Sequence, residues 1–492
     1  HIPIMWIYKL VFENIIAHRY NIWQHEKGAI DMAGNRVEKD LVGARVVPED
    51  AYYGIHSLRA QENFPITGHK LHPQMIESLA HVKKACAEAN RQAGAVPETV
   101  ARAIEQACDE ILEGRFRDQF IVDPVQGGAG TSTNMNANEV IANRAIEILG
   151  GTKGDYTLVN PNDHVNRGQS TNDVYPSCGR MTAYVLMEKL LKALDELIVA
   201  FHKKAEEFDG VIKMGRTQLQ DAVPMRLGQE FQAYARVMER EKGRLVRARE
   251  EMLVLNLGGT AIGTCLNAHP IFVERVVPIL AEQTGIPFVP CDNRIDGTQN
   301  ADAYPVLSGA LKGAGMSLSK ICNDLRLMSS GPRAGLSEIV LPARQNGSSI
   351  MPGKVNPVIP EVVTQVAFRL AGYDTTVSMA AEAGQLELNA FEPMIFDSLN
   401  QGIEQFTHAV ETLTVNCVEG ILANEAACRA EVERSIGIVT ALCPTIGYTA
   451  ACHLAQEALK TGTPVRELVV SKGLLTGEQV EQALDPVRMT GR

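Results

Sequence analysis

The amino-acid sequence predicts a mainly α-helical protein built around several long helices. Apolar residues recur at spacings of three and four along three separate stretches, which is the period of a helix with one buried face. Each stretch is about 25 residues or longer, beyond the usual globular helix. Seams of this length and regularity are typical of packed helix bundles. Strand-like alternation is sparse, and no repeat of fixed period is present.

Residues 1–31 are predicted to be an appendage outside the fold. The opening HIPIMWIYKLVFENIIAH is apolar, but Lys9 and Glu13 interrupt it and no small-residue cleavage site follows, which argues against a signal peptide. MAGNRVEKD, from Met32, is typical of an ordinary protein start. An interfacial amphipathic anchor is the alternative, although its polar face is not strongly basic. No run of the chain is long and apolar enough to predict a membrane span.

An N-terminal domain is predicted over residues 32–171. Its best strand candidate is ARVVPEDAYYGI, near residues 44–55. GGAGTSTNMNANE, at 127–139, is predicted to be a polar loop. NPNDHVNRGQSTND, at 160–173, leads into the first long helix and marks the end of the domain.

The three apolar seams place a central helical-bundle domain at residues 172–426. GRTQLQDAVP, at 215–224, is predicted to be a polar loop between two of the long helices, and NLGGTAIGT, at 256–264, a turn or close helix contact, because it lacks the pattern of a nucleotide site. Residues 427–492 then form a small C-terminal helical domain. The seams consist of Leu186, Leu190, Leu194, Leu197, Phe201, Ala205 and Phe208, of Phe231, Tyr234, Met238, Leu245, Ala248, Met252 and Leu255, and of Leu307, Leu311, Ala314, Leu318, Ile321, Leu325 and Met328.

Charge and cysteine content exclude some classes of protein. Asp and Glu number 58 against 47 Lys and Arg, giving a net charge of −11, so the chain is a poor candidate for general nucleic-acid binding. An anionic ligand would need positive charge focused locally. The ten cysteines lie at least nine residues apart, so zinc-type spacing is absent. We expect free thiols in a reducing, cytoplasmic compartment.

Four polar clusters stand out from the helical background. They lie within 127–139, 169–173, 215–224 and 347–361, and they are rich in Ser, Thr, Asn and Gln. Such side chains donate hydrogen bonds to carboxylate oxygens without adding charge. For each cluster taken alone, simple capping of a helix is the alternative. The last cluster, GSSIMPGKVNPVIPE, contributes little core and carries one lysine, which favours a functional role.

Together these strings resemble the aspartase/fumarase superfamily of lyases. GTSTNMNANEV, GRTQLQDAVP and GSSIMPGKVNP match its three motif regions in order, and the resemblance runs from about Met32 to the C-terminus. It implies a three-domain fold whose long central helices form the shared core of a homotetramer. It also implies active sites that take loops from three chains and a small-molecule substrate. The sequence itself shows no His/Asp/Glu constellation for a required metal and no cofactor motif, so none is expected.

The sequences of these motifs resemble the aspartase branch more than the fumarases. Gln218 stands where typical fumarases carry histidine, and MAAEAGQLELNAFEP, at 379–393, is aspartase-like. Cys443 to Thr445 depart from the family pattern. The resemblance implies elimination of ammonia from L-aspartate to give fumarate through an aci-carboxylate. Two alternatives are a class II fumarase and a non-catalytic structural descendant.

The resemblance also assigns roles to individual residues. Ser348 is the implied general base, and Ser349 beside it offers a backbone donor. His164 is interpreted as a structural or interface residue. The implied substrate ligands are Thr131, Ser170 and Thr171 for the β-carboxylate, Asn172, Thr217 and Gln218 for the amino group and α-carboxylate, and Lys354 and Asn356 for the α-carboxylate.

Overall fold

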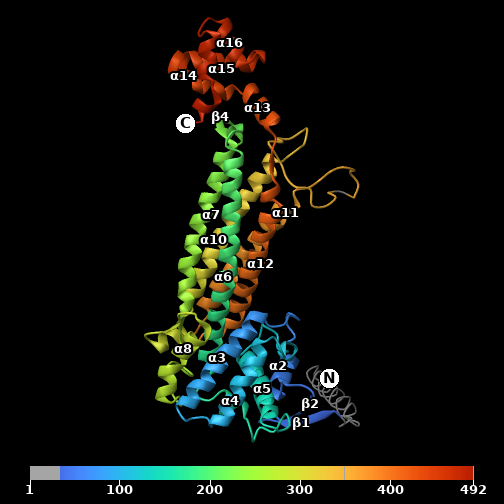
Figure 1. The fold of residues 1–492 in the computed structure, drawn as a ribbon, viewed down its shortest axis with the longest axis vertical. Helices are drawn as coiled ribbons and strands as arrows, with labels where there is room; N and C mark the ends of the chain where they lie inside the picture. The colour runs from blue at the N-terminus through green and yellow to red at the C-terminus, as the bar shows by residue number, and fades with distance from the viewer. Residues whose placement is uncertain (1–33, 348, 491–492) are drawn as a thin grey trace, which may run out of the picture.

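The computed structural model describes residues 34–347 and 349–490, and its content is mainly helical, as predicted. Figure 1 shows a long bundle of helices with the N-terminal helices packed around one end and the C-terminal helices gathered at the other. The predictions made for residues 1–31 and for Ser348 lie outside the described residues.

Five long helices form the bundle. The three predicted seams follow the buried faces of α6, α7 and α10, except that Met252 and Leu255 of the second seam are buried beyond the end of α7. α11 and α12 complete the bundle, packing on each other and on α10 and α6 respectively. The sequence of α11 shows no single apolar seam, because Phe368 and Met379 face outward and are 63% and 68% exposed. The bounds are α6 Thr171–Glu207, α7 Leu227–Glu250, α10 Ala303–Met328, α11 Val358–Glu382 and α12 Glu392–Asn416.

The N-terminal part pairs a small hairpin with four helices. The strand expected near 44–55 is β2, which ends at Pro48, after which the chain enters α2. α3 packs against α4, α6 and α8. The elements are β1 Asn35–Lys39, β2 Ala44–Pro48, α2 Ile55–Asn63, α3 Pro73–Gln92, α4 Glu98–Leu112, η1 Arg117–Gln119, α5 Thr131–Ile148 and the π-helical turn η2 Pro161–Val165.

The prediction of a polar loop over 127–139 was wrong beyond Gly130. α5 begins at Thr131, and its asparagines are buried along the helix. Buried amides are tolerated there because they have partners: Asn136 accepts from the Ile121 N–H at 2.9 Å and donates to the Gln119 carbonyl at 3.0 Å. Polar composition therefore concealed a buried helix.

The prediction of a loop over 215–224 was also wrong. This segment is an antiparallel hairpin of β3, Ile212–Thr217, and β4, Gln220–Arg226, with a register shift near Gly215. Gln218 and Leu219 form its two-residue turn, with φ of 54° and 62°. Such turns usually carry Asn-Gly or Asp-Gly, so Gln-Leu gave no hairpin signal.

The remaining elements lie beside the bundle or cap its far end. A second hydrophobic core holds α13–α18 together and includes Met214 of the hairpin. The segment 256–268 is a loop, as expected for its glycine-rich start. The elements are η3 Glu251–Leu253, β5 Val254–Leu255, α8 Pro270–Thr284, β6 Val289–Pro290, α9 Arg294–Gln299, β7 Ile339–Val340, η4 Val418–Gly420, β8 Leu422–Ala423, α13 Glu425–Arg434, η5 Ile436–Ile438, α14 Val439–Ile446, α15 Tyr448–Thr461, α16 Val465–Ser471, α17 Gly477–Ala483 and α18 Pro486–Met489.

Candidate active site

The start of α6 gathers three of the predicted substrate ligands. Ser170 is the N-cap and its hydroxyl accepts from the Asn172 N–H at 3.2 Å, while Asp173 completes a capping box. Thr171 is buried, and its Oγ1 accepts from Nδ2 of Asn134 at 3.1 Å. Within the described part of the chain, neither hydroxyl hydrogen has a hydrogen-bond acceptor. Both hydroxyls are therefore set to donate to an anion.

Thr131 opens α5 beside this helix start. Gly130 precedes it with φ of 89°, and a Cβ there would lie 2.4 Å from the ring of Tyr175 on α6. The Thr131 hydroxyl donates to the Gly128 carbonyl at 2.7 Å. It must rotate away from that carbonyl before it can donate to a ligand. The structure thus brings Thr131 close to the Ser170–Asn172 group through the packing of α5 on α6.

A buried polar network supports Thr171 from behind. Asn134 also donates to Oδ1 of Asn166 at 3.2 Å, and the same oxygen accepts from Nζ of Lys83 at 2.9 Å. Lys83 is fully buried, and this burial lowers the pKa of its ammonium group to about 8. Its second acceptor is Gln169 Oε1, also at 2.9 Å. A lysine held by neutral amides places positive charge beneath the helix start. The buried asparagines at 134 and 138, four apart, were the sequence signal for this network.

Thr217 and Gln218 lie at the other end of the bundle. Both are exposed at the tip of the β3–β4 hairpin. The base of the hairpin is fixed by buried ion pairs: Glu338 lies 2.6 Å from Arg216 and 3.0 Å from Lys213. Arg216 also reaches Glu431 of α13 at 2.6 Å. Sequence reasoning missed these ionic contacts because their members are far apart in the chain.

The loop that leads into α11 carries Ser349, Lys354 and Asn356. Ser349 and Lys354 are exposed, and Asn356 donates to the Gly347 carbonyl at 2.6 Å. A Cβ on Gly347 would lie 2.2 Å from the Lys354 carbonyl oxygen. Gly347 is therefore required by a close backbone contact that closes the loop on itself. Figure 1 shows this segment as an extended loop beside the end of α11 that faces the C-terminal helices.

One chain does not bring its predicted ligands into one site. Ser170, Thr171 and Asn172 begin α6, whereas the hairpin follows the end of α6. The helix has 37 residues, so at 1.5 Å per residue its ends lie about 55 Å apart. Each chain thus presents two separate groups of site residues, one at each end of the bundle.

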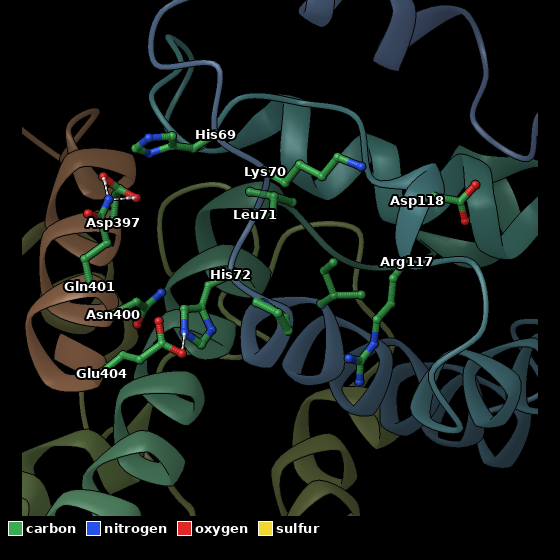
Figure 2. Close-up of a pocket in the computed structure, with 12 residues that line it drawn as sticks. His69, Lys70, Leu71, His72, Arg117, Asp118, Asp397, Asn400, Gln401 and Glu404 are labelled. Atoms are coloured by element: carbon green, nitrogen blue, oxygen red, sulfur yellow. Dashed lines mark hydrogen bonds and ion pairs between the residues drawn. The ribbon is translucent and has the colours of Figure 1, made fainter. Parts of the chain in front are cut away.

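A cavity of about 450 Å³, lined by both apolar and charged residues, lies at the junction of the N-terminal helices with α12. Figure 2 shows His72 turned toward Glu404, with Gln401 bonded to Asp397 on the same helix and Arg117 on the opposite side. Nε2 of His72 lies 3.3 Å from Oε1 of Glu404, and burial lowers the pKa of this imidazole. None of the predicted site residues that the structure describes lines this cavity.

His164, interpreted as a structural or interface residue, lies in a short helical turn. His164 lies in η2, where its Nδ1 accepts from the Asn160 N–H at 2.9 Å, and burial lowers the pKa of its imidazole. All ten cysteines are free thiols.

Across the described residues, no group of three or more His, Cys, Asp or Glu side chains is arranged to hold a metal ion. A search of the helices in the same residues found none long and apolar enough to cross a membrane.

Comparison with known families places this architecture. Residues 43–372 match the family described as "Lyase", and residues 438–491 match "Fumarase C C-terminus". The first match spans most of the chain, and this protein belongs to that lyase family.

Individual relatives are more specific. Aspartate ammonia-lyase from Bacillus subtilis (strain 168) is 54% identical, covering 92% of this chain and 96% of its own. The enzyme of the same name from Escherichia coli (strain K12) is 51% identical, covering 91% and 94%. These similarities confirm the predicted resemblance to the aspartase branch.

Solved structures share the fold at high similarity. Fumarate lyase:delta crystallin from Brucella melitensis, bound to cobalt, has a TM-score of 0.91 at 49% identity, covering 93% of this chain and 100% of its own. Class II fumarase from Schistosoma mansoni has a TM-score of 0.89 at 36% identity, covering 93% and 99%.

Proposed function

We propose that this protein catalyses the reversible elimination of ammonia from L-aspartate to give fumarate. The observation that carries the proposal is the identity of 51–54%, over more than nine-tenths of the chain, to relatives named aspartate ammonia-lyase. The neutral hydroxyl and amide groups at the start of α6 support it, because they suit a carboxylate substrate.

The difficult step is removal of a proton from the carbon beside the β-carboxylate. The resulting aci-carboxylate carries two negative charges on one carboxyl group and needs fixed donors. We assign these donors to Thr131, Ser170 and Thr171, of which the last two have their hydroxyl hydrogens available. Ser348 is the proposed base, and a serine can serve as a base only when its alkoxide is stabilised by nearby donors and positive charge.

The other end of the substrate falls to the exposed groups. Lys354 supplies the local positive charge that an acidic chain needs for an anionic substrate, and Asn356 joins it on the α-carboxylate. Asn172 suits the ammonium group of the substrate. Its Nδ2 donates to the Ala261 carbonyl at 2.7 Å, so its amide oxygen is the atom that accepts from the ammonium group. Thr217 and Gln218 complete this half, with a backbone donor from Ser349.

The separation of the two groups of site residues favours a shared site in a homotetramer. About 55 Å of helix divides them within one chain, so a complete site requires the ends of different chains to meet. Outward-facing Phe368 and Met379 on α11 supply apolar surface for such an assembly. We propose sites built from three chains, in a cytoplasmic enzyme. The reaction calls for no cofactor, because ammonia leaves as a neutral molecule and the product is conjugated.

Fumarase activity is the second candidate. It is favoured by the match of residues 438–491 to the fumarase C C-terminus and by the shared fold with class II fumarase. The lower identity to that fumarase, 36%, and Gln218 in place of histidine weigh against it.

The test is fumarate absorbance with L-aspartate and, separately, with L-malate. We expect kcat/KM for L-aspartate to be at least about a hundredfold higher, or roughly 2.7 kcal/mol in transition-state binding. Equal rates or a preference for malate would make the protein a fumarase. No fumarate from either substrate would favour the non-catalytic descendant.

A mixing experiment tests the shared site. Thr171→Val and Lys354→Ala alter opposite ends of the bundle, and each is expected to be nearly inactive alone. If different chains supply the two ends, co-refolding equal amounts restores activity at about a quarter of the sites. Mixed tetramers without regained activity would place both ends of a site in one chain.

A further inference from the structure

Asp173, the third residue of α6, has a fully buried carboxylate that binds three backbone N–H groups. Its Oδ1 accepts from Ser170 at 2.9 Å, and its Oδ2 accepts from Gly258 and Thr260, both at 3.0 Å. The first donor is the N-cap of α6, and the other two belong to the loop 256–268. One carboxylate therefore joins the helix start to a loop more than eighty residues away in sequence.

The loop lies against the candidate ligands in a strained conformation. Thr260 has φ of 59°, which is an outlier for a β-branched residue. Asn172 donates to the Ala261 carbonyl at 2.7 Å, and Asn256 donates to the Asn172 carbonyl at 3.0 Å. Strain of this kind persists only where surrounding contacts hold it in place, and the Asp173 carboxylate supplies two of those contacts.

We infer that Asp173 is a positioning residue of the active site, whose ionised carboxylate fixes the loop 256–268 against α6 and so aims Ser170, Thr171 and Asn172 at the substrate. This inference rests on the proposed function, because those three residues are substrate ligands only within it. Asp173 itself does not touch the substrate.

The surroundings of Asp173 make its charge sensitive to pH. The titratable groups that face it are Lys83 and Cys86 on α3 and Cys178 on α6. Burial raises the pKa of Asp173 to about 6, against the opposing effect of its backbone donors and of Lys83. Below that pH the carboxyl gains a hydrogen and can no longer accept from all three N–H groups.

Asp123 provides a matched control elsewhere in the chain. Its Oδ1 accepts from the Val125 N–H at 2.9 Å, and its Oδ2 accepts from Thr67 and Gly68 at 2.7 and 3.0 Å. The pattern of one nearby and two distant backbone donors is the same, but these segments carry no predicted ligand. Burial opposes its ionisation, yet these hydrogen bonds hold the pKa of Asp123 below its usual value.

The experiment compares wild type, Asp173→Asn and Asp123→Asn. An Asn keeps the size of the side chain but has one accepting oxygen, so one side of the junction loses its acceptor. We expect Asp173→Asn to lower kcat for L-aspartate by about 10- to 100-fold, as a small misplacement does, and to raise KM by a smaller factor. Asp123→Asn should keep the wild-type kcat. Rates are taken per folded protein, checked by mass and thermal midpoint.

A pH profile separates positioning from mere stabilisation. Wild type and Asp123→Asn should lose kcat as the pH falls through about 6, whereas Asp173→Asn should lack that step. A wild-type kcat in Asp173→Asn, or the same acid step in all three proteins, would overturn the inference. If Asp173→Asn does not fold, Asn256→Ala replaces it, because this variant loosens the same loop from its other side. We expect Asn256→Ala to lower kcat while keeping the loss of kcat near pH 6. An unchanged kcat in Asn256→Ala would also overturn the inference.

Failure of the proposed function has a different signature. Wild type that makes no fumarate from L-aspartate would remove the proposed reaction but not the geometry. Calorimetric titration with fumarate then decides the inference. Weaker binding by Asp173→Asn than by wild type and Asp123→Asn would support positioning, and equal binding by all three would refute it.

Discussion

The two ends of the bundle differ in how completely one chain builds them. At the start of α6, Thr171 is buried, its Oγ1 is held by Asn134, and a fully buried lysine lies behind the network. At the other end, Thr217, Gln218 and Lys354 are exposed on a hairpin tip and a projecting loop. The first group is preorganised within one chain, whereas the exposed side chains of the second group are not held by buried contacts of that chain.

This difference suggests a division of labour. Fixed donors are most effective where charge develops, because they need no reorganisation during the reaction. Groups that bind the charged substrate must first admit it, which suits an exposed loop. The buried end is therefore expected to stabilise the transition state, and the exposed end to bind substrate and supply the base.

The largest expected effect concerns the base at the exposed end. Ser348→Ala should lower kcat by about 10²–10⁴, toward the upper limit because no other base is proposed. The thermal midpoint should barely change, since the substitution removes one hydroxyl group and no apolar group. Hydrogen exchange at the aspartate β-carbon in deuterated buffer is the measurement. Exchange at the wild-type rate would show that the loop only clamps the substrate.

The ion pairs beneath the hairpin should matter to stability more than to chemistry. Glu338 is fully buried against Lys213 and Arg216, and Glu338→Gln leaves both cations without their common partner. Breaking a buried pair costs about 3–5 kcal/mol. Lys213 keeps Glu230 and Arg216 keeps Glu431, each at 2.6 Å, so we expect a loss near the lower end of that range. Urea unfolding measures it, with Lys242→Ala, in an exposed pair with Asp195 at 2.5 Å, as the surface control. Equal losses in the two variants would mean that the hairpin base is not specially stabilised.

The sequence predicted the long helices because their seams repeat over many turns, and it predicted a helix start near α6 because the polar stretch 160–173 precedes the first seam. It missed the β3–β4 hairpin because Gln218 and Leu219 are unusual turn residues, and it missed the start of α5 because buried asparagines look like loop. Such errors arise where tertiary hydrogen bonds outweigh local preference.

The motif resemblance supplied the candidate ligands and their division among chains, but not the contacts that hold them in place. No local pattern reports that Asp173 binds Gly258, or that Glu338 joins Arg216 to Lys213, because these contacts join distant parts of the chain. The 37-residue length of α6 is the local feature that places the two groups of site residues at opposite ends of the bundle.

Thr171 tests the preorganised end directly. Thr171→Val keeps the shape but removes the hydroxyl that accepts from Asn134 and is free to donate. Losing one such donor typically lowers kcat by about 10²–10³, and here KM should change less than kcat. Thr182→Val, on the same helix and also buried, removes a hydroxyl bonded to the Cys178 carbonyl and should affect stability only. A rise in KM alone for Thr171→Val would move this residue to ground-state binding.

The smallest expected effect is a pH dependence of stability at the same end. Glu392, the first residue of α12, is fully buried near Arg180, and its Oε2 has no hydrogen-bond partner in the described chain. Burial raises the pKa of this carboxyl to about 8, against an ordinary 4.5. Between these values the folded state holds a proton that the unfolded state has released, so stability falls as the pH rises.

The contribution of Glu392 is thus complete below about pH 4.5 and lost by about pH 8. Each pH unit inside that window should lower the unfolding free energy by at most about 1.4 kcal/mol. Glu392→Gln keeps the shape of the neutral side chain and cannot ionise, so it should lack this slope. The difference between wild type and Glu392→Gln in urea unfolding at pH 6 and pH 7 isolates the effect from other titrating groups. A difference that does not change with pH would mean that Arg180 keeps Glu392 ionised, and that this buried end holds an ion pair rather than a neutral acid.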